Sequence, residues 1–98
     1  MPQELSKNGW QDFLKLCTTF QTPEDLNQFF DLFLTIEEKE TLSRRFLVVK
    51  ALLEGELTQR EISEIHKVSI AQITRGSNAL KIISPKLKNK LKSGFSSP

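Results

Sequence analysis

The stretch from residue 57 to residue 81 constrains this chain more than any other segment. Thr58 precedes Glu61 by three residues, which is the spacing of a capping box at the start of a helix. Ser69 is placed to cap a second helix a few residues later. The apolar positions expected to face inward are Ile62, Ile65, Ile73 and Leu80. This pattern predicts two short helices joined by a tight turn at residues 66–69, which is a helix-turn-helix.

The outward positions of these two helices carry side chains of neutral or positive charge. They are Gln59, Arg60, Gln72, Thr74, Arg75, Asn78 and Lys81. Such groups can hydrogen-bond to base edges and place cations beside phosphates. The alternative is an ordinary helical hairpin with a solvated polar face. The caps, the hairpin spacing and a second helix without acidic residues favour a DNA-reading element.

Charge is distributed unevenly along the chain, although the net charge is only +2. Residues 1–57 hold six Lys and Arg against ten Asp and Glu, a balance of −4. Residues 58–98 hold eight against two, a balance of +6. Basic charge is therefore concentrated in the half with the helix-turn-helix, as expected for a protein that binds a polyanion. A basic solvated face without a partner is the alternative.

Composition excludes several other classes of protein. Ninety-eight residues, 38% of them hydrophobic, predict one small domain over residues 1–98. No apolar run approaches the ~20 residues of a transmembrane helix, and the N-terminus lacks the features of a signal peptide. One cysteine (Cys17) and one histidine (His66) provide neither a metal-binding cluster nor a nucleophile–base pair. We expect a cytoplasmic protein that is not an enzyme, binds no metal and does not enter membranes.

Helical periodicity predicts four further helices and no strand, so the fold class is all-α with six helices. The first carries a stripe of Trp10, Phe13, Leu14, Cys17 and Phe20. The second begins at Pro23 with Thr22 as its N-cap, and the third covers about residues 36–54 and ends at Gly55. The last begins at Pro85 and is followed by a frayed tail at 93–98.

The second and third helices are more apolar than one small domain requires. The second has large apolar residues at Leu26, Phe29, Phe30, Leu32, Phe33 and Leu34. The third has a core stripe of Leu42, Phe46, Val49 and Leu53, widened by Leu47, Val48 and Leu52. A lone chain has little to cover both faces of such helices, so we expect a dimer.

The segment Ile-Thr-Arg-Gly-Ser-Asn-Ala-Leu-Lys at residues 73–81 resembles the recognition helix of the tryptophan repressor family, in which its first six residues are a near-signature. A second set of residues resembles the other half of that family's corepressor pocket. These are Leu34, Thr35, Glu37, Glu38, Leu42 and Arg45. The similarity runs without gaps from about Trp10 to Leu91. It implies an intertwined homodimer that binds double-stranded operator DNA and uses L-tryptophan as corepressor.

The resemblance also implies a ligand site. Arg45 and Arg75 would clamp the indole ring, because a guanidinium group both binds a carboxylate and stacks on an aromatic ring. The remaining implied ligand residues are Leu32 and Leu34, whose nearby backbone carbonyls would accept from the ammonium group, and Thr35, Val48, Gly76 and Ala79 around the slot. Gly76 leaves space for the ligand. Alanine at position 79 replaces the family's usual serine and removes one hydroxyl group.

For DNA, the resemblance and the side-chain chemistry indicate two sets of residues. Base edges are expected to meet Ile70, Ala71, Gln72 and Thr74; phosphates are expected to meet Gln59, Arg60, Asn78 and Lys81, with Arg60 also able to reach a guanine. Gln72 replaces a smaller threonine of the family. Lys67 occupies the turn where glycine is usual, and a left-handed backbone there would cost ~1 kcal/mol.

Two rival functions remain open from the sequence. One is a helix-turn-helix regulator that binds DNA without tryptophan, or with another indole ligand. The other is a helical interaction module that uses the Phe29 to Leu34 surface for a protein partner. Salt-sensitive duplex binding separates the second rival from the repressor.

Overall fold

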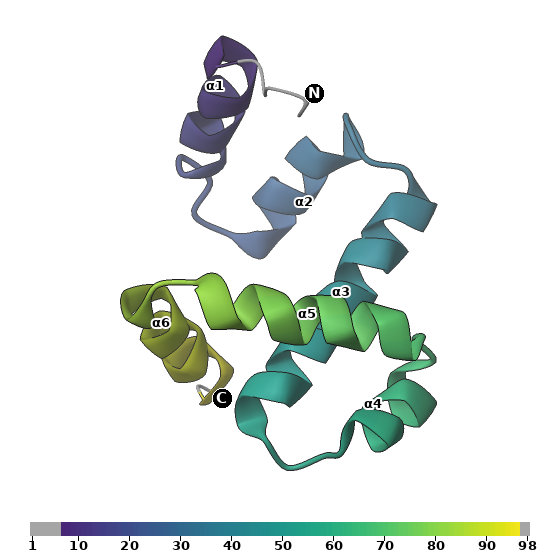
Figure 1. Ribbon diagram of the computed structural model, residues 1–98. Coiled ribbons are helices and arrows are strands. Elements are labelled where there is room, and N and C mark those ends of the chain that lie inside the picture. The colour runs from purple at the N-terminus through teal and green to yellow at the C-terminus, as the bar shows by residue number, and fades with distance from the viewer. Residues whose placement is uncertain (1–6, 97–98) are drawn as a thin grey trace. The chain divides into compact units, whose positions relative to one another are not determined.

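The structure is a computed structural model that describes residues 7–96, and over that range it contains six α-helices and no β-strand (Figure 1). The helices are α1 (Lys7–Cys17), α2 (Pro23–Asp31), α3 (Ile36–Glu54), α4 (Gln59–His66), α5 (Ile70–Ile82) and α6 (Pro85–Ser96). The predicted all-α fold class is therefore confirmed. The chain divides between Ile36 and Glu37 into two compact units. The single domain and the homodimer stay predictions.

Local hydrogen bonds at the helix starts follow the predicted caps. The Thr22 hydroxyl accepts from the backbone N–H of Asp25 at 3.1 Å, with Pro23 in the first turn of α2. At α4, Thr58 and Glu61 form a reciprocal capping box, with bonds of 2.8 and 3.1 Å. Each bond satisfies a backbone donor that the helix itself leaves unpaired, which is why the helices begin at these residues.

The first unit packs through aromatic rings on α1, on α2, in the segment between them and in the segment after α2. Phe29 is buried, and its ring centroid lies 5.0 Å from that of Phe20, 5.1 Å from that of Phe33 and 5.5 Å from that of Phe13. Trp10 stacks on Phe13 at 5.6 Å but remains 46% exposed. The expected stripe of α1 is therefore only partly covered within the single chain.

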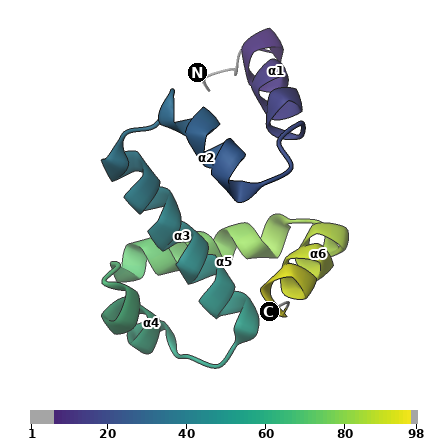
Figure 2. The same cartoon turned by 180° about the vertical axis from the view of Figure 1, so that it is seen from behind.

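The second unit is built around one apolar core that joins α3 to the helix-turn-helix. Its buried side chains are Val48 and Ala51 of α3, Ile62 of α4, Val68 of the turn and Ile73 of α5. Figures 1 and 2, which view the molecule from opposite sides, both show α5 crossing α3. Ile62 and Ile73 have no exposed surface, so the two helices of the motif are fixed to each other and to α3.

The turn of the motif takes a left-handed conformation at Lys67, with φ 54° and ψ 48°. The Ser63 hydroxyl donates to the Val68 carbonyl oxygen at 2.7 Å, and the Val68 N–H donates to the Ser63 carbonyl at 3.3 Å. These bonds hold the strained turn and direct Val68 into the core. Lys67 therefore bears the cost that a left-handed backbone imposes on a residue other than glycine.

Three packing predictions were wrong within the single chain. Ile65 is 59% exposed, because Val68, which is 7% exposed, fills the core after the short α4 ends. Leu42 and Phe46 are 51% and 53% exposed, because α3 turns a neighbouring stripe, which contains Val48 and Ala51, toward the motif.

The expected frayed tail at 93–98 also differs from the structure. Helix α6 continues to Ser96, and residues 97–98 lie outside the described residues. The ring of Phe95 meets that of Phe46 edge to face, with centroids 5.4 Å apart. This contact gives the last turn of α6 an apolar partner, which the Gly- and Ser-rich sequence did not indicate.

Candidate ligand pocket and DNA-reading face

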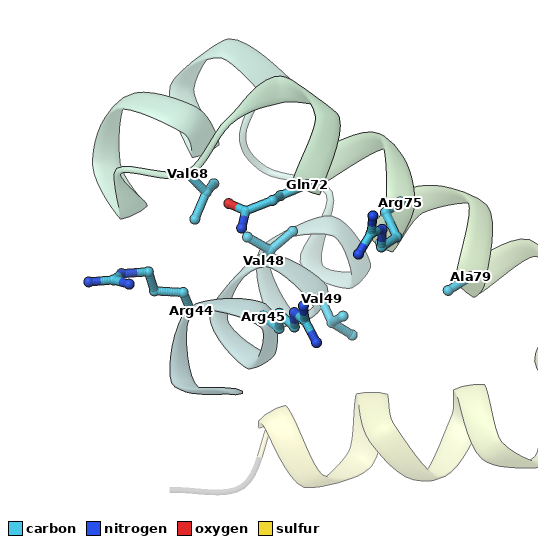
Figure 3. Close-up of a pocket in the computed structure, with 9 residues that line it drawn as sticks. Arg44, Arg45, Val48, Val49, Val68, Gln72, Arg75 and Ala79 are labelled. Carbon is cyan, nitrogen blue, oxygen red and sulfur yellow. The ribbon is translucent and has the colours of Figure 1, made fainter. Parts of the chain in front are cut away.

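A pocket of about 220 Å³ opens between α3 and the helix-turn-helix in the second unit (Figure 3). It is lined by Arg44, Arg45, Val48, Val49, Val68, Gln72, Arg75, Gly76 and Ala79. This volume lies below the range of ~300–1,000 Å³ that is common for drug-sized ligands, so the pocket suits a small molecule. None of the nine lining residues is acidic, whereas three are arginines.

Arg45 and Arg75 give the pocket its charge. They come from α3 and α5, so the pocket has a guanidinium group on each helix. Within residues 7–96, neither of these side chains has a hydrogen bond or an ion pair. Arg44 differs, because it pairs with Glu40 at 3.7 Å and extends away from the other lining side chains in Figure 3. Two free cations beside an apolar surface favour an anionic ligand that also has a flat apolar part.

The pocket walls are apolar and rigid. Val48 and Val68 belong to the buried core, with 3% and 7% exposure. A Cβ at Gly76 would lie 3.4 Å from Val48 Cγ1 and 3.4 Å from Leu52 Cδ1, which is ordinary van der Waals contact. The packing of α5 on α3 therefore does not by itself require glycine, and the ligand space that the resemblance implies remains the reason offered for this residue.

Gln72 lies at the edge of the pocket and at the start of α5. Its Oε1 accepts from the Ser69 N–H at 3.3 Å, and its own N–H donates to the Ser69 Oγ at 3.2 Å. This is a second capping box, with glutamine in the place of the more usual glutamate. The amide oxygen is thereby fixed toward the cap, and Figure 3 shows the amide nitrogen on the side of Val48.

Of the eight ligand residues expected from the sequence, the structure brings five together in this pocket. These are Arg45, Val48, Arg75, Gly76 and Ala79. The other three belong to the first unit: Leu32 is the C-cap of α2 and is 76% exposed, and Leu34 and Thr35 follow it before α3. Their place in a ligand site stays a prediction.

The eight residues expected to meet DNA are all exposed, on α4 and α5. They are Gln59, Arg60, Ile70, Ala71, Gln72, Thr74, Asn78 and Lys81. Arg60 reaches Glu64 at 3.6 Å, but the two side chains are 88% and 69% exposed, so this pair leaves the guanidinium group accessible. The contacts of these residues with DNA stay predictions.

Electrostatics at the start of α4 follow from its cap. The Thr58 backbone N–H, and then the Thr58 hydroxyl group, hydrogen-bond with the Glu61 carboxylate and lower the pKa of Glu61 from its usual value.

Among residues 7–96, no three His, Cys, Asp or Glu side chains are grouped so that they could hold a metal ion. Over the same range, the helices lack the length and apolar character needed to cross a membrane.

Comparison with known proteins identifies the family. The family model described as Trp repressor protein matches residues 8–94 of this chain. The chain belongs to the Trp repressor family. This family consists of transcription regulators that act as repressors and not of enzymes, so the prediction that the chain is not an enzyme is confirmed.

Individual members of the Trp repressor family match nearly the whole chain. The Trp operon repressor homolog of Chlamydia caviae is 60% identical over 92 residues, which cover 94% of this chain and 91% of that protein. The homolog of Chlamydia trachomatis serovar D is 54% identical over 82 residues, 84% of this chain and 87% of that protein. The homolog of Vibrio parahaemolyticus is 38% identical over 92 residues, with coverages of 94% and 89%.

Four pocket residues were not expected as ligand residues: Arg44, Val49, Val68 and Gln72. A helical spacing could have found two of them. Gln72 precedes Arg75, Gly76 and Ala79 by three, four and seven residues, so all four share one face of α5. Val49 follows Arg45 by four residues on α3. No comparable signal indicated Val68, because its position depends on the turn.

Proposed function

We propose that this protein is a tryptophan-activated, DNA-binding transcriptional repressor of genes for tryptophan biosynthesis or uptake. L-tryptophan binds between Arg45 and Arg75 and orients α5 for the operator. The observation that carries the proposal is the pocket set against the helix-turn-helix, with apolar walls and two guanidinium groups that have no ion pair or hydrogen bond within residues 7–96. Membership in the Trp repressor family and the similarity to Trp operon repressor homologs support the choice of ligand.

The chemistry of L-tryptophan suits this pocket. Its carboxylate needs a cation, which Arg45 or Arg75 supplies with paired hydrogen bonds. Its indole ring needs a flat slot, and a guanidinium plane stacks well on an aromatic face. Leu32 and Leu34 would supply backbone acceptors for the ammonium group, and Thr35 would help to close the slot.

Arg75 links the ligand to DNA because it lies on the same helix as the base-reading residues. In helix-turn-helix proteins, tryptophan repressors among them, the second helix of the motif lies in the major groove. A ligand between α3 and α5 favours one orientation of α5 over others. The ligand can strengthen DNA binding only by as much free energy as separates its binding to the DNA-competent orientation of α5 from its binding to the other orientations.

The proposed active form is a homodimer that works in the cytoplasm, where the DNA is. The single chain leaves large apolar side chains exposed, including Leu32 at 76%, Phe33 at 56% and Ile36 at 78% in the first unit. In the second unit, Leu42 and Phe46 are 51% and 53% exposed. Such surfaces are typical of chains that meet another subunit.

The test is fluorescence anisotropy of a labelled palindromic operator-like duplex, at fixed salt, with and without excess L-tryptophan and with a scrambled duplex as reference. We expect tryptophan to tighten binding to the specific duplex about tenfold or more, which is a coupling of ~1.4 kcal/mol. Arg45→Ala and Arg75→Ala should lose this response while sedimentation shows an unchanged oligomeric state.

Lys86→Ala is the matched control, because it removes an exposed cation of α6 that does not line the pocket. This variant should keep the tryptophan response. Tight binding of the native chain that is indifferent to tryptophan would retain the DNA-binding function and refute the ligand mechanism. A full tryptophan response in Arg45→Ala would refute the clamp.

A further inference from the structure

Gln72 differs from the other pocket residues because it both caps a helix and lines the pocket. Through the capping box with Ser69 it holds the first turn of α5, and through its side chain it lines the pocket. The sequence indicated a base-reading role, in which glutamine offers both its amide oxygen and its amide nitrogen to adenine. In the structure the amide oxygen is already engaged by the Ser69 N–H, so that paired contact requires the cap to open.

The cap determines which end of the amide is available. Since Oε1 accepts from the Ser69 N–H at 3.3 Å, the Nε2 group with its two N–H donors is the free end. Figure 3 shows this nitrogen on the side of Val48, and Gln72 and Arg75 both line the pocket. The free end of Gln72 thus adds a neutral donor to the guanidinium donors of the pocket.

We infer that Gln72 is a ligand-specificity residue: its amide nitrogen donates a hydrogen bond to the carboxylate of the bound amino acid while its amide oxygen holds the start of α5. The inference rests on the proposed function. Of the polar groups of L-tryptophan, the ammonium and the indole N–H donate, so the carboxylate is the acceptor that an N–H donor can meet. A smaller side chain such as threonine could not span the same distance from cap to pocket.

This arrangement ties the ligand to the reading end of the helix-turn-helix. One amide group contacts the ligand with its nitrogen and the Ser69 backbone with its oxygen. A ligand carboxylate polarises that amide and strengthens the hydrogen bond on its other side. The first turn of α5, which carries Ile70 and Ala71, is then held more firmly when the ligand is present.

Two substitutions separate donation from capping. Gln72→Glu keeps an oxygen for the Ser69 N–H, since glutamate is the usual partner in a capping box, and it places negative charge at a helix start, where such charge is favourable. It replaces the pocket donor by a charged acceptor. Gln72→Met keeps the approximate length of the side chain but removes both the cap and the donor, without adding charge.

Asn89→Asp is the matched control, because it makes the same amide-to-carboxylate change at an exposed position of α6 that does not line the pocket. The dissociation constant for L-tryptophan is measured by titration calorimetry without DNA, together with the melting temperature of each variant. Binding of L-tryptophan to the native chain is measured before the variants, because the proposed function requires that the native chain bind this ligand.

We expect Gln72→Glu to weaken L-tryptophan binding about tenfold or more, the size of effect that follows the loss of a hydrogen bond to a charged group. Its melting temperature should stay near that of the native chain. Gln72→Met should weaken binding about fivefold or more and also lower the melting temperature. Asn89→Asp should bind as the native chain does.

Each other outcome overturns the inference in an identifiable way. If only Gln72→Glu bound L-tryptophan more weakly, the cause would be the added charge and not a lost hydrogen bond from the amide nitrogen. If only Gln72→Met bound L-tryptophan more weakly, Gln72 would act through the helix cap. Native affinity in both variants would remove Gln72 from the ligand site while leaving the proposed function intact. A native chain that binds no L-tryptophan would overturn the proposed function and this inference together.

Discussion

The left-handed turn residue Lys67 provides a quantitative test of how the helix-turn-helix is held. With φ 54° and ψ 48°, its Cβ crowds the following carbonyl oxygen, and this conformation costs a non-glycine residue about 1–2 kcal/mol. Glycine removes that cost, but it makes the unfolded chain more flexible and so forfeits about 0.4–1 kcal/mol. Lys67→Gly should therefore raise the free energy of unfolding by about 0.5–1 kcal/mol.

The assay is urea denaturation at one fixed subunit concentration, because the stability of the proposed dimer would depend on concentration. In a thermal scan the same gain corresponds to an increase of about 2–8 °C for a domain of this size. Lys67→Ala is the control, since it removes the charge and the long side chain but keeps a Cβ in the strained conformation. Its stability should stay close to that of the native chain.

The reasoning is refuted if Lys67→Gly is less stable than the native chain, or if Lys67→Ala gains as much as Lys67→Gly. The first result would mean that the bonds between Ser63 and Val68 do not hold the turn in its present form. The second would place the cost in the lysine side chain rather than in the backbone.

Four further predictions concern the cap of α4, the pocket and the last helix. Thr58→Ala should destabilise the protein by about 1 kcal/mol in urea denaturation. Because the pKa of Glu61 is lower in the folded state than in the unfolded state, the Glu61 carboxylate stabilises the fold above its unfolded-state pKa. This stabilisation is lost as the pH falls through the folded-state pKa. In Glu61→Gln, the free energy of unfolding should therefore fall less than in the native chain between about pH 6 and about pH 3. Ala79→Ser should tighten L-tryptophan binding in calorimetry by about 2- to 12-fold, if the hydroxyl reaches the ligand, and unchanged affinity would argue against contact at this position. Phe95→Ala should cost about 0.5–1.5 kcal/mol through loss of the edge-to-face contact with Phe46, and hydrogen exchange in the last turn of α6 should speed up.

The features that the sequence predicted well are those decided within a few residues. Thr22, Thr58 and Ser69 accept from backbone donors three residues ahead, and such bonds need no knowledge of the rest of the fold. The bounds of α3 and the start of α6 at Pro85 agree with the sequence for the same reason.

The features that the sequence predicted poorly depend on which neighbour a helix meets. On α3, the apolar stripe through Phe46 and the stripe through Val48 are both helical in spacing, so periodicity alone could not say which would be buried. The pairing of Arg45 with Arg75 around a pocket came from the family resemblance and not from spacing. Gln72 was assigned to base reading from the resemblance and its polar side chain, although its spacing of three residues from Ser69 is that of a capping box, which the structure contains.

Val48 and Val68 belong both to the buried core and to the wall of the pocket. The room for the ligand is thus set by the same side chains that keep the helix-turn-helix folded. To bind a bulkier indole compound, the protein would have to replace one of these core valines with a smaller residue. Each methyl group lost in this way would lower the free energy of unfolding and so leave less stability to offset further mutations. The range of signals that this scaffold can evolve to sense is therefore limited by its stability reserve, and its ligand preference should change more readily at Ala79, outside the core.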